Sequence, residues 1–281
     1  MTRPTIVSIQ SQLVFGCAGN NAAVPLLQRL GATVYAIPTA LLSNTPHYPS
    51  IAGGPVDPVL IEDLLARLLD RVAPTDIDAI LTGYIASVGA AAATARFIDR
   101  VRERHPDVVV LCDPVMGDVD TGPYVEAEVA EALISNLVPR ADILTPNLFE
   151  ARRLIGAPDG DASSILDALL AQHVRVAAVT GIEARQHQVR TIVGEGNGQW
   201  TVVTPRLDLR PTGTGDVFSA AFLHRFLDTH AVDRALEAAV DAVFALLEAC
   251  RNAGAAELEP YHFERPKSGT VARFRAKPME R

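Results

Sequence analysis

The sequence has few cysteines and no long apolar run. Its three cysteines, Cys17, Cys112 and Cys250, lie far apart without CxxC spacing, so the pattern predicts neither a zinc site nor a disulfide framework. No apolar stretch approaches the roughly 20 residues that cross a bilayer, and the opening MTRPTIVSIQ lacks the apolar segment of a signal peptide. We therefore expect a cytoplasmic protein with no membrane partner.

The charge balance argues against a polyanionic partner. The 281 residues carry a net charge of −8, and 48% of them are hydrophobic, so the chain can bury a large core. We expect no nucleic-acid binding. Basic residues are enriched only in a C-terminal tail at about 260–281, which we expect to be solvated or to dock on another subunit. There Arg265, Lys267, Arg273, Arg275, Lys277 and Arg281 outnumber Glu264 and Glu280.

Hydrophobic periodicity predicts one α/β domain over 1–281. Runs rich in Val and Ile predict strands at 5–10, 33–38, 78–83, 108–114, 142–146 and 175–181. Apolar residues at three- and four-residue spacing predict helices, among them 20–31, 57–72, 86–105, 215–228 and 232–252. This alternation indicates a mostly parallel central sheet between two helical layers. The glycine-rich EGNG turn within 188–207 predicts an antiparallel edge hairpin.

A glycine-rich loop, PTGTGDVF at 211–218, matches neither common nucleotide-binding loop. A dinucleotide-binding turn needs a third glycine where Phe218 stands, and a P-loop needs Lys followed by Ser or Thr. The remaining functional interpretation is an anion-binding loop at a helix N-terminus, with Asp216 as a base for phosphoryl transfer. The alternative is that Thr214 or Asp216 only caps the helix.

Two other predicted strands end at polar residues. In VVVLCDPVMGD the strand stops at Asp113, whose carboxylate we expect at the carboxyl edge of the sheet, where ligands of open α/β sheets bind. In DILTPNLFE the strand stops at Thr145, and Asn147 and Glu150 open a helix with the spacing of an ordinary capping box. Such acids can hold magnesium on nucleotide phosphates, often through water.

Five segments carry a closer resemblance: SIQSQLVFGCAGNNAA (8–23), GYIAS (83–87), LCDPVMGD (111–118), TPNLFEARRL (145–154) and GTGDVFSAAF (213–222). In order and spacing they resemble the pyridoxal kinases of the ribokinase-like superfamily, over nearly the whole chain. GTGD with TPNxxE is shared across the superfamily, whereas SxQSxxVxGxxGN with CDPVMGD is more particular to pyridoxal kinases. The resemblance implies a ribokinase-like fold and ATP-dependent phosphorylation of the hydroxymethyl group of pyridoxal, with pyridoxine and pyridoxamine as further acceptors, in vitamin B6 salvage.

The resemblance also implies residue roles on the nucleotide side. Asp216 matches the family's catalytic base, and Gly213, Thr214 and Gly215 match its anion hole. Asp113 and Glu150 match the acids that organise Mg²⁺, mostly through water. The other positions implied at the ATP phosphates and the lid are Asp118, Tyr124, Thr145, Asn147, Thr180 and Thr212, with Gly213 and Gly215. K⁺ is a candidate activator, and a homodimer is expected by family likeness.

On the acceptor side, Ser11 matches the residue that hydrogen-bonds the polar edge of the pyridine ring, and Tyr84 matches the aromatic that stacks near it. Ala18 lies at the floor of the implied pocket. Each also has an ordinary reading: a turn former, a half-buried core aromatic and a packing residue.

One loop departs from the family. Pyridoxal kinases carry SNHTxY after the second strand, where this chain reads SNTPHY at 43–48, so Thr45 and Pro46 replace the His and Thr that face the acceptor. Lost polar partners weaken discrimination between acceptors. His47, shifted by a place or two, is the candidate to compensate, and the preferred acceptor stays open.

The sequence weighs against four alternatives. Hydroxymethylpyrimidine kinases show GxDxSGGAGIQAD after the first strand, and this chain lacks that Asp and Gly-Gly, as it lacks the early Gly-Gly of sugar kinases. A non-catalytic pyridoxal phosphate binder would fit loss of the base, yet Asp216 is intact. A pyridoxal-phosphate-dependent enzyme needs a Schiff-base lysine, and both lysines, Lys267 and Lys277, lie in the tail.

Overall fold

The computed structural model describes residues 3–157, 159–172, 174–185, 187–264 and 271–279. Arg265, Lys267, Glu280 and Arg281 of the predicted tail lie outside this part of the chain. Within it, no helix combines the length and the apolar character that a membrane span requires.

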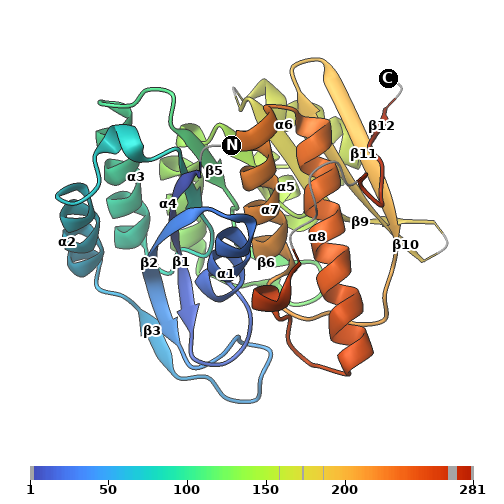
Figure 1. Cartoon of the computed structure of the whole chain (residues 1–281), viewed down its shortest axis with the longest axis horizontal. Helices are drawn as coiled ribbons and strands as arrows, with labels where there is room; N and C mark the ends of the chain where they lie inside the picture. Colours follow the sequence, from blue (N-terminus) through green and yellow to red (C-terminus); the bar gives the residue numbers. More distant parts are fainter. Residues whose placement is uncertain (1–2, 158, 173, 186, 265–270, 280–281) are drawn as a thin grey trace.

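A mixed β-sheet runs through the molecule in the strand order β12-β11-β10-β9-β8-β5-β4-β1-β2-β3 (Figure 1). Neighbouring strands are parallel among β1 (Thr5–Leu13), β2 (Thr33–Leu42), β4 (Ala79–Thr82), β5 (Val109–Cys112), β8 (Ile143–Leu144) and β9 (Val176–Ala184). Antiparallel strands extend both edges: β3 (Gly53–Pro55) on one side, and β10 (Gln188–Glu195), β11 (Gly198–Pro205) and β12 (Lys277–Pro278) on the other.

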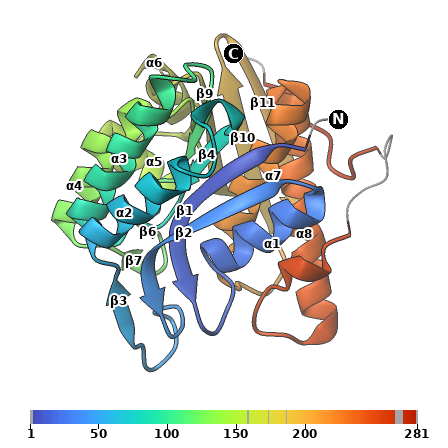
Figure 2. The same ribbon diagram turned by 60° about the vertical axis from the view of Figure 1, so that its left-hand side comes forward.

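Helices cover both faces of this sheet (Figures 1 and 2). One face packs against α2 (Pro58–Leu69), α3 (Val88–Arg102), α4 (Ala127–Asn136), α5 (Leu148–Ile155) and α6 (Ala162–Ala171). The other packs against α1 (Asn20–Leu30), α7 (Thr214–Thr229) and α8 (Val232–Ala253). Short 3₁₀ turns are η1 (Pro74–Asp76), η2 (Val138–Arg140) and η3 (Pro260–His262). The predicted three-layer α/β/α class with an antiparallel edge hairpin is confirmed.

Strand β1 shows how the sequence reaches this arrangement. Successive side chains of a strand point to opposite faces. Val7 and Ile9 join the apolar layer under α2–α6, while Ile6 joins the layer under α1, α7 and α8. Ser8 and Gln10 share the face of Ile6 and are fully or almost fully buried, so they need polar partners there.

Those partners come from the start of α1. Ser8 Oγ donates to Asn20 Oδ1 at 2.8 Å, Gln10 Nε2 donates to Ser8 Oγ at 2.9 Å, and Asn20 Nδ2 donates to the Gln10 carbonyl at 3.2 Å. One residue on, Asn21 Oδ1 accepts the backbone N–H of Leu13 at 2.8 Å. The SIQSQ and GNN parts of the first motif therefore fix the turn from β1 into α1.

Some short elements escaped sequence analysis. The hairpin of β6 (Gly117–Asp118) and β7 (Gly122–Pro123) forms a separate two-stranded sheet, and β3 and β12 are edge strands. Each contains two or three residues, too few for a periodic pattern, and each is defined by the strand it pairs with.

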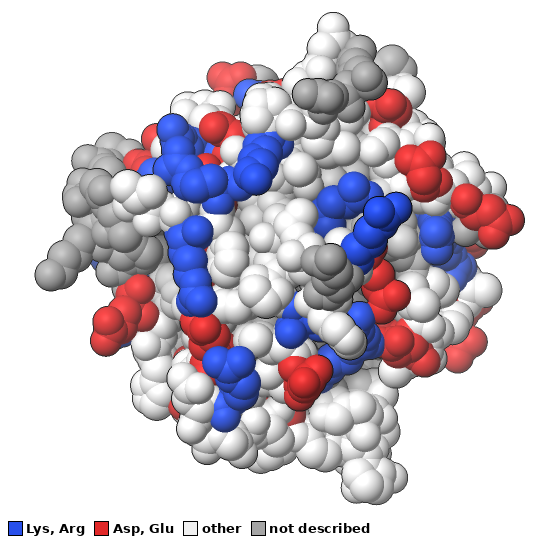
Figure 3. Space-filling view, turned by 90° about the vertical axis from the view of Figure 1, so that its right-hand side faces the viewer, with Lys and Arg blue, Asp and Glu red and all other residues white. Residues whose placement is uncertain are grey.

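The described part of the basic tail folds back on its own chain. Arg275 Nε lies 3.0 Å from Glu237 Oε1, and Arg273 forms an ion pair with Glu248 while its guanidinium lies 4.6 Å from the centre of the Phe244 ring. All three partners belong to α8. On this side of the molecule basic and acidic side chains are interspersed (Figure 3).

Candidate active site

Three carboxylates from distant parts of the chain meet at one end of the sheet. Asp113 follows β5, Glu150 lies in the first turn of α5, and Asp216 lies in the first turn of α7. Asp113 is 5% exposed and Glu150 3%. The pKa of the Asp113 carboxyl is raised well above its usual range by burial, and next by the charges of Glu150 and Asp216. The expected position of Asp113 at the carboxyl edge of the sheet is confirmed, and Glu150 and Asp216 lie near it.

Asp216 is not the N-cap of its helix. The N-cap is Gly213, whose φ of 86° lies in the left-handed region, and no side chain caps this end. The Asp216 carboxylate instead accepts the backbone N–H of Gly19, at the start of α1. Neither Thr214 nor Asp216 is therefore the N-cap of α7, although the Asp216 carboxylate also accepts its own backbone N–H in the first turn. Desolvation by the surrounding protein raises the pKa of Asp216 to about 6, outweighing the lowering effect of the Gly19 hydrogen bond.

Two glycines allow the close contacts around Asp216. A Cβ on Gly213 would lie 2.2 Å from the carbonyl oxygen of Cys17, and one on Gly19 would lie 2.5 Å from both Ser11 O and Ser11 Oγ. Both residues also have positive φ, which side chains other than glycine rarely adopt. Ser11 and Asp216 therefore both contact Gly19, and the predicted anion hole lies against the loop that follows β1.

Asp113 is held by a residue that sequence analysis missed. Ser219, on α7 one turn after Asp216, donates from Oγ to Asp113 Oδ2 at 3.0 Å, and its Oγ lies 2.8 Å from Thr145 Oγ1. Ser219 is 1% exposed. A serine inside a predicted amphipathic helix gives no signal of this kind.

Glu150 has two structural roles at once. With Asn147 it forms the predicted capping box of α5, since Glu150 N–H donates to Asn147 Oδ1 at 3.0 Å and Asn147 N–H donates to Glu150 Oε2 at 2.9 Å. Its Oε1 also accepts the backbone N–H groups of Met116 at 2.9 Å and Gly117 at 3.5 Å. Burial nevertheless raises the pKa of Glu150 to about 8. Next to Asn147, the backbone N–H of Thr180 donates to the Pro146 carbonyl at 3.0 Å.

The β6–β7 hairpin carries two of the residues implied at the nucleotide. Tyr124 donates its hydroxyl proton to Asp118 Oδ2, and Asp118 Oδ1 accepts the backbone N–H of Thr121 at 2.7 Å. Asp120, at the turn, forms an ion pair with Arg210 from the loop that leads to Gly213. The hairpin is thereby joined to the glycine-rich loop.

The loop that departs from the family forms its own polar pair. Thr45 Oγ1 lies 2.7 Å from His47 Nδ1, and His47 Nε2 lies 3.8 Å from Glu257 Oε1. Thr45 is buried, and His47 is exposed. Tyr84, after β4, is half-buried and is held to β2 by its carbonyl oxygen, which accepts from Thr39 Oγ1 at 2.6 Å. Ala18 is half-buried between Cys17 and Gly19.

The donor set suits a cation held through water. Among the described residues, no three His, Cys, Asp or Glu side chains converge closely enough to bind a metal directly. Burial raises the pKa of both Asp113 and Glu150, and the charge of Glu150 raises the pKa of Asp113 further. A nearby divalent cation would relieve that repulsion, and carboxylates with water are ligands that Mg²⁺ accepts.

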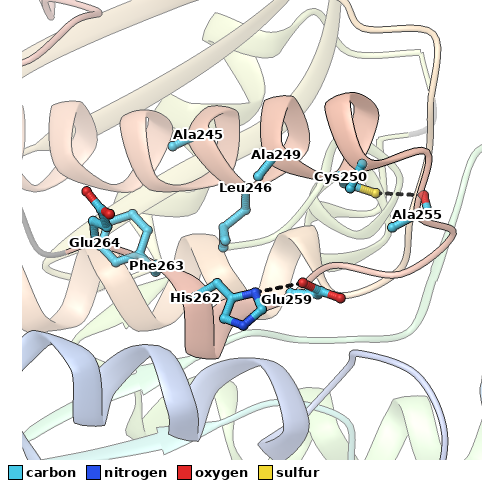
Figure 4. A pocket seen from close by; sticks show the side chains of 10 residues that line it. Ala245, Leu246, Ala249, Cys250, Ala255, Glu259, His262, Phe263 and Glu264 are labelled. Carbon is cyan, nitrogen blue, oxygen red and sulfur yellow. Dashed lines mark hydrogen bonds and ion pairs between the residues drawn. The ribbon is translucent and has the colours of Figure 1, made fainter.

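A cavity of about 300 Å³ lies away from these residues, between α8 and the segment that follows it (Figure 4). Its walls include Leu246 and Phe263, and at its rim His262 Nδ1 lies 2.8 Å from Glu259 Oε2. None of its lining residues belongs to the carboxylate site.

Residues 14–260 match the family model described as phosphomethylpyrimidine kinase. The chain is 40% identical over 259 residues to the pyridoxine/pyridoxal/pyridoxamine kinase of Bordetella avium (strain 197N), which covers 90% of this chain and 88% of that protein. It is 35% identical over 281 residues to pyridoxal kinase PdxY of Deinococcus radiodurans, with 93% of each chain covered.

Solved structures support the same relationship. The pyridoxal kinase from Leishmania donovani in complex with ADP and pyridoxamine superposes with a TM-score of 0.89 at 29% identity, covering 98% of this chain and 99% of that one. A putative phosphomethylpyrimidine kinase from Bacteroides thetaiotaomicron, at 23% identity, shares the fold with a TM-score of 0.86 over 99% of both chains.

The buried acids predict a stability cost that depends on pH. Because the folded-state pKa of Asp113 lies above its unfolded value, stability is lost as pH rises and this carboxyl ionises. Asp113→Asn should therefore raise the Tm of the ligand-free protein more at pH 9 than at pH 5, by about 2–4 °C for each kcal/mol relieved. Thermal unfolding with a chelator present measures this.

Asp63→Asn, on the exposed side of α2, is the matched control and should leave Tm unchanged at both pH values. A Tm gain for Asp113→Asn that is equal at both pH values, or a loss at pH 9, would contradict the account.

Proposed function

The chain belongs to the phosphomethylpyrimidine kinase family and, within it, to the pyridoxal kinases of the ribokinase-like superfamily, and from this membership we propose that it phosphorylates pyridoxal with ATP. The acceptor is the hydroxymethyl group, and the product is pyridoxal 5′-phosphate. Pyridoxine and pyridoxamine are further acceptors, because the Bordetella avium relative is named as a kinase for all three.

One observation carries the proposal: a desolvated carboxylate beside a glycine-rich helix N-terminus. Asp216 has a pKa of about 6 and does not cap α7. A general base works best when its pKa lies near the working pH. The N-terminal N–H groups of α7 lie beside it and attract an anion through their partial positive charge.

These groups supply the proton transfer and part of the charge stabilisation of the transfer step. Asp216 takes the proton of the acceptor hydroxyl while the hydroxyl oxygen bonds to the γ-phosphorus of ATP. The bond between that phosphorus and the β,γ-bridging oxygen breaks, which releases ADP. The backbone N–H groups of Gly213, Thr214 and Gly215 donate to the charge that develops on the transferring group. Gly19 N–H holds the Asp216 carboxylate in place for the proton transfer.

For the nucleotide we propose the edge formed by the β6–β7 hairpin and the ends of β8 and β9. The contacts that support this assignment join Asp118 to Tyr124, Thr145 to Ser219, and Thr180 to the backbone next to Asn147. Thr212 precedes the anion hole and is half-buried. Arg210, paired with Asp120, supplies a positive side chain near this edge.

A divalent metal is expected for a kinase of this family, and we propose Mg²⁺. Asp113 and Glu150 would hold it, mostly through water, and when bound it neutralises charge on the transferring phosphates. Ser219 orients the Asp113 carboxylate, and three backbone N–H groups orient Glu150. K⁺ as an activator stays a prediction.

For the acceptor we propose a pocket formed by Ser11, Ala18, Thr45, His47 and Tyr84. The Thr45–His47 pair supports the idea that His47 compensates for the family histidine. The imidazole of His47 lies within hydrogen-bond distance of the buried Thr45 hydroxyl, and Thr45 occupies the position of that histidine. Phosphomethylpyrimidine kinase activity is the second candidate, favoured by the description of the matching family model. The missing Asp and Gly-Gly after β1 weigh against it.

We also propose one kinase domain over 1–281 and a cytoplasmic location. Two apolar layers that share a single sheet support the first. Cys17, Cys112 and Cys250 are buried free thiols, which supports a reducing compartment.

A substrate panel tests the activity. A coupled ADP assay should show ATP consumption with pyridoxal, pyridoxine or pyridoxamine that a chelator abolishes and Mg²⁺ restores. Hydroxymethylpyrimidine and ribose should be poorer acceptors by kcat/KM. A preference for either of those two, or turnover that survives metal removal, would exclude the proposed function.

Loss of the base should affect turnover rather than nucleotide binding. Asp216→Asn should lower kcat by about 10²-fold or more, the usual contribution of a general base, with little change in the dissociation constant of ADP. In the wild type, kcat/KM should fall below pH 6, because protonation of Asp216 removes the base. Full turnover in Asp216→Asn would remove this residue from the mechanism.

The homodimer is a proposal that rests on an exposed apolar stretch. Leu41, Ile51, Val59 and Leu60 are 49–67% exposed and lie on or beside β2, β3 and the start of α2. Light scattering should give twice the chain mass of 30.0 kDa. Leu60→Asp should shift this toward the monomer, and Val203→Asp on β11 should not. A monomer for the unaltered chain rejects the proposal.

A further inference from the structure

Glu257 lies in the segment after α8 and contacts three separate loops of the candidate site. Its Oε2 accepts the backbone N–H of Cys17 at 2.9 Å and lies 3.4 Å from Thr212 Oγ1. Its Oε1 accepts the hydroxyl of Tyr48 at 2.5 Å and lies 3.8 Å from His47 Nε2. Nothing in the sequence pattern pointed to this residue.

The first contact reaches the anion-binding loop. The Cys17 carbonyl accepts from Thr212 Oγ1 at 3.3 Å, and the Gly213 Cα packs so closely against that carbonyl that no Cβ would fit. The N–H and the C=O of Cys17 thus link Glu257 on one side to the N-cap of α7 on the other. This loop therefore packs directly against the start of the helix that carries Asp216.

The second contact reaches the acceptor loop. Tyr48 belongs to the SNTPHY segment, and its ring packs edge-on against Phe15 with centroids 5.5 Å apart. His47 is bonded to the buried Thr45. The carboxylate of Glu257 therefore joins the loop predicted to face the acceptor to the loop predicted to face the migrating phosphoryl group.

The segment that carries Glu257 is anchored. Leu258, the next residue, is 3% exposed and belongs to the apolar layer under α1, α7 and α8, and Gly254 ends α8 in the left-handed conformation. The Glu257 side chain is only 14% exposed. A Cβ on Gly16 would lie 3.3 Å from Glu257 Oε2, so the loop after β1 closes over this carboxylate.

We propose that Glu257 is a positioning residue that holds the acceptor loop and the anion-binding loop at the spacing needed for phosphoryl transfer. The inference rests on the proposed kinase function and deepens it. Two donors, the Cys17 N–H and the Tyr48 hydroxyl, bond one to each of its oxygens, and the Thr212 hydroxyl lies within reach of both Oε2 and the Cys17 carbonyl. An ionised carboxylate accepts at both oxygens, whereas an amide accepts at one oxygen only, so either the Cys17 N–H or the Tyr48 hydroxyl would lose its acceptor.

Glu257→Gln tests this with little change in volume. It should lower kcat/KM for pyridoxal by about 10-fold or more, since a displacement of about 1 Å can cost up to 10²-fold in rate. The dissociation constant of ADP should change less than 2-fold, because Glu257 contacts none of Asp118, Asn147 and Glu150, and its contact with Thr212 adjoins the anion hole for the γ-phosphoryl group, which ADP lacks. A uniform loss of structure would weaken ADP binding as well.

Tyr48→Phe removes one of the contacts and should reproduce part of the loss. The two changes together should cost less than the product of the separate effects, because both break the same contact. Multiplicative effects would show that Glu257 does not act through Tyr48.

Glu259→Gln is the matched control. It makes the same chemical change two residues away, where Glu259 pairs with His262 at the rim of the cavity in Figure 4. Its kinetics and Tm should equal those of the wild type. Comparison of Tm for both variants separates positioning from general destabilisation.

Hydrogen exchange provides a readout that needs no turnover. Peptides over 14–19, 43–50 and 211–215 should all exchange faster in Glu257→Gln and not in Glu259→Gln. If the wild type phosphorylates pyridoxal but Glu257→Gln matches it in kinetics and exchange, the positioning role is wrong and the kinase function stands. If the wild type phosphorylates none of the acceptors, the kinase function fails, and unchanged exchange then rejects the loop linkage as well.

Discussion

The close approach of three carboxylates at the carboxyl end of the sheet is the constraint on which the site depends. Asp113, Glu150 and Asp216 would repel one another if all were ionised, and burial increases that cost. Fixed donors hold each of them: Ser219 for Asp113, backbone N–H groups for Glu150 and the Gly19 N–H for Asp216. In the proposed function, a cation bound between these acids and the phosphates would relieve this repulsion.

The residues around this constraint explain why the motifs have their composition. Gly213 and Gly19 are needed because carbonyl and hydroxyl oxygens fill the space of a side chain. Asn147 caps α5 by accepting the Glu150 N–H, donates its own N–H to Glu150 Oε2 and donates from Nδ2 to the Gly117 carbonyl at 2.8 Å. A residue that looks like an ordinary cap in the sequence thus also joins Glu150 to the β6–β7 hairpin, so its capping role does not exclude the proposed role at the nucleotide.

Sequence analysis was strongest where one pattern is repeated or shared. Buried strands and amphipathic helices show periodicity, so the layers and the edge hairpin were predictable, and Asp216 and Glu150 could be found because glycine and capping motifs surround them. Ser219 and Glu257 carry no local signal. Their importance arises from contacts with residues 106 and 240 positions away, which only the folded chain reveals. The altered loop suggested that His47 compensates for the family histidine, and this stays a prediction; the structure shows His47 Nδ1 2.7 Å from Thr45 Oγ1.

The short strand β12 has a consequence for how the molecule behaves at high concentration. It lies on the free side of β11, where Lys277 pairs with Thr201 and Pro278 with Trp200. The buried Glu237 carboxylate accepts the backbone N–H of Ala276, the residue before β12, at 3.0 Å. An uncovered hairpin edge can form hydrogen bonds with strands of other molecules. Lysine and proline are common on the edge strands of natural sheets because the charge and the missing N–H disfavour such association. We therefore expect Lys277 and Pro278 to disfavour edge-to-edge association through this hairpin.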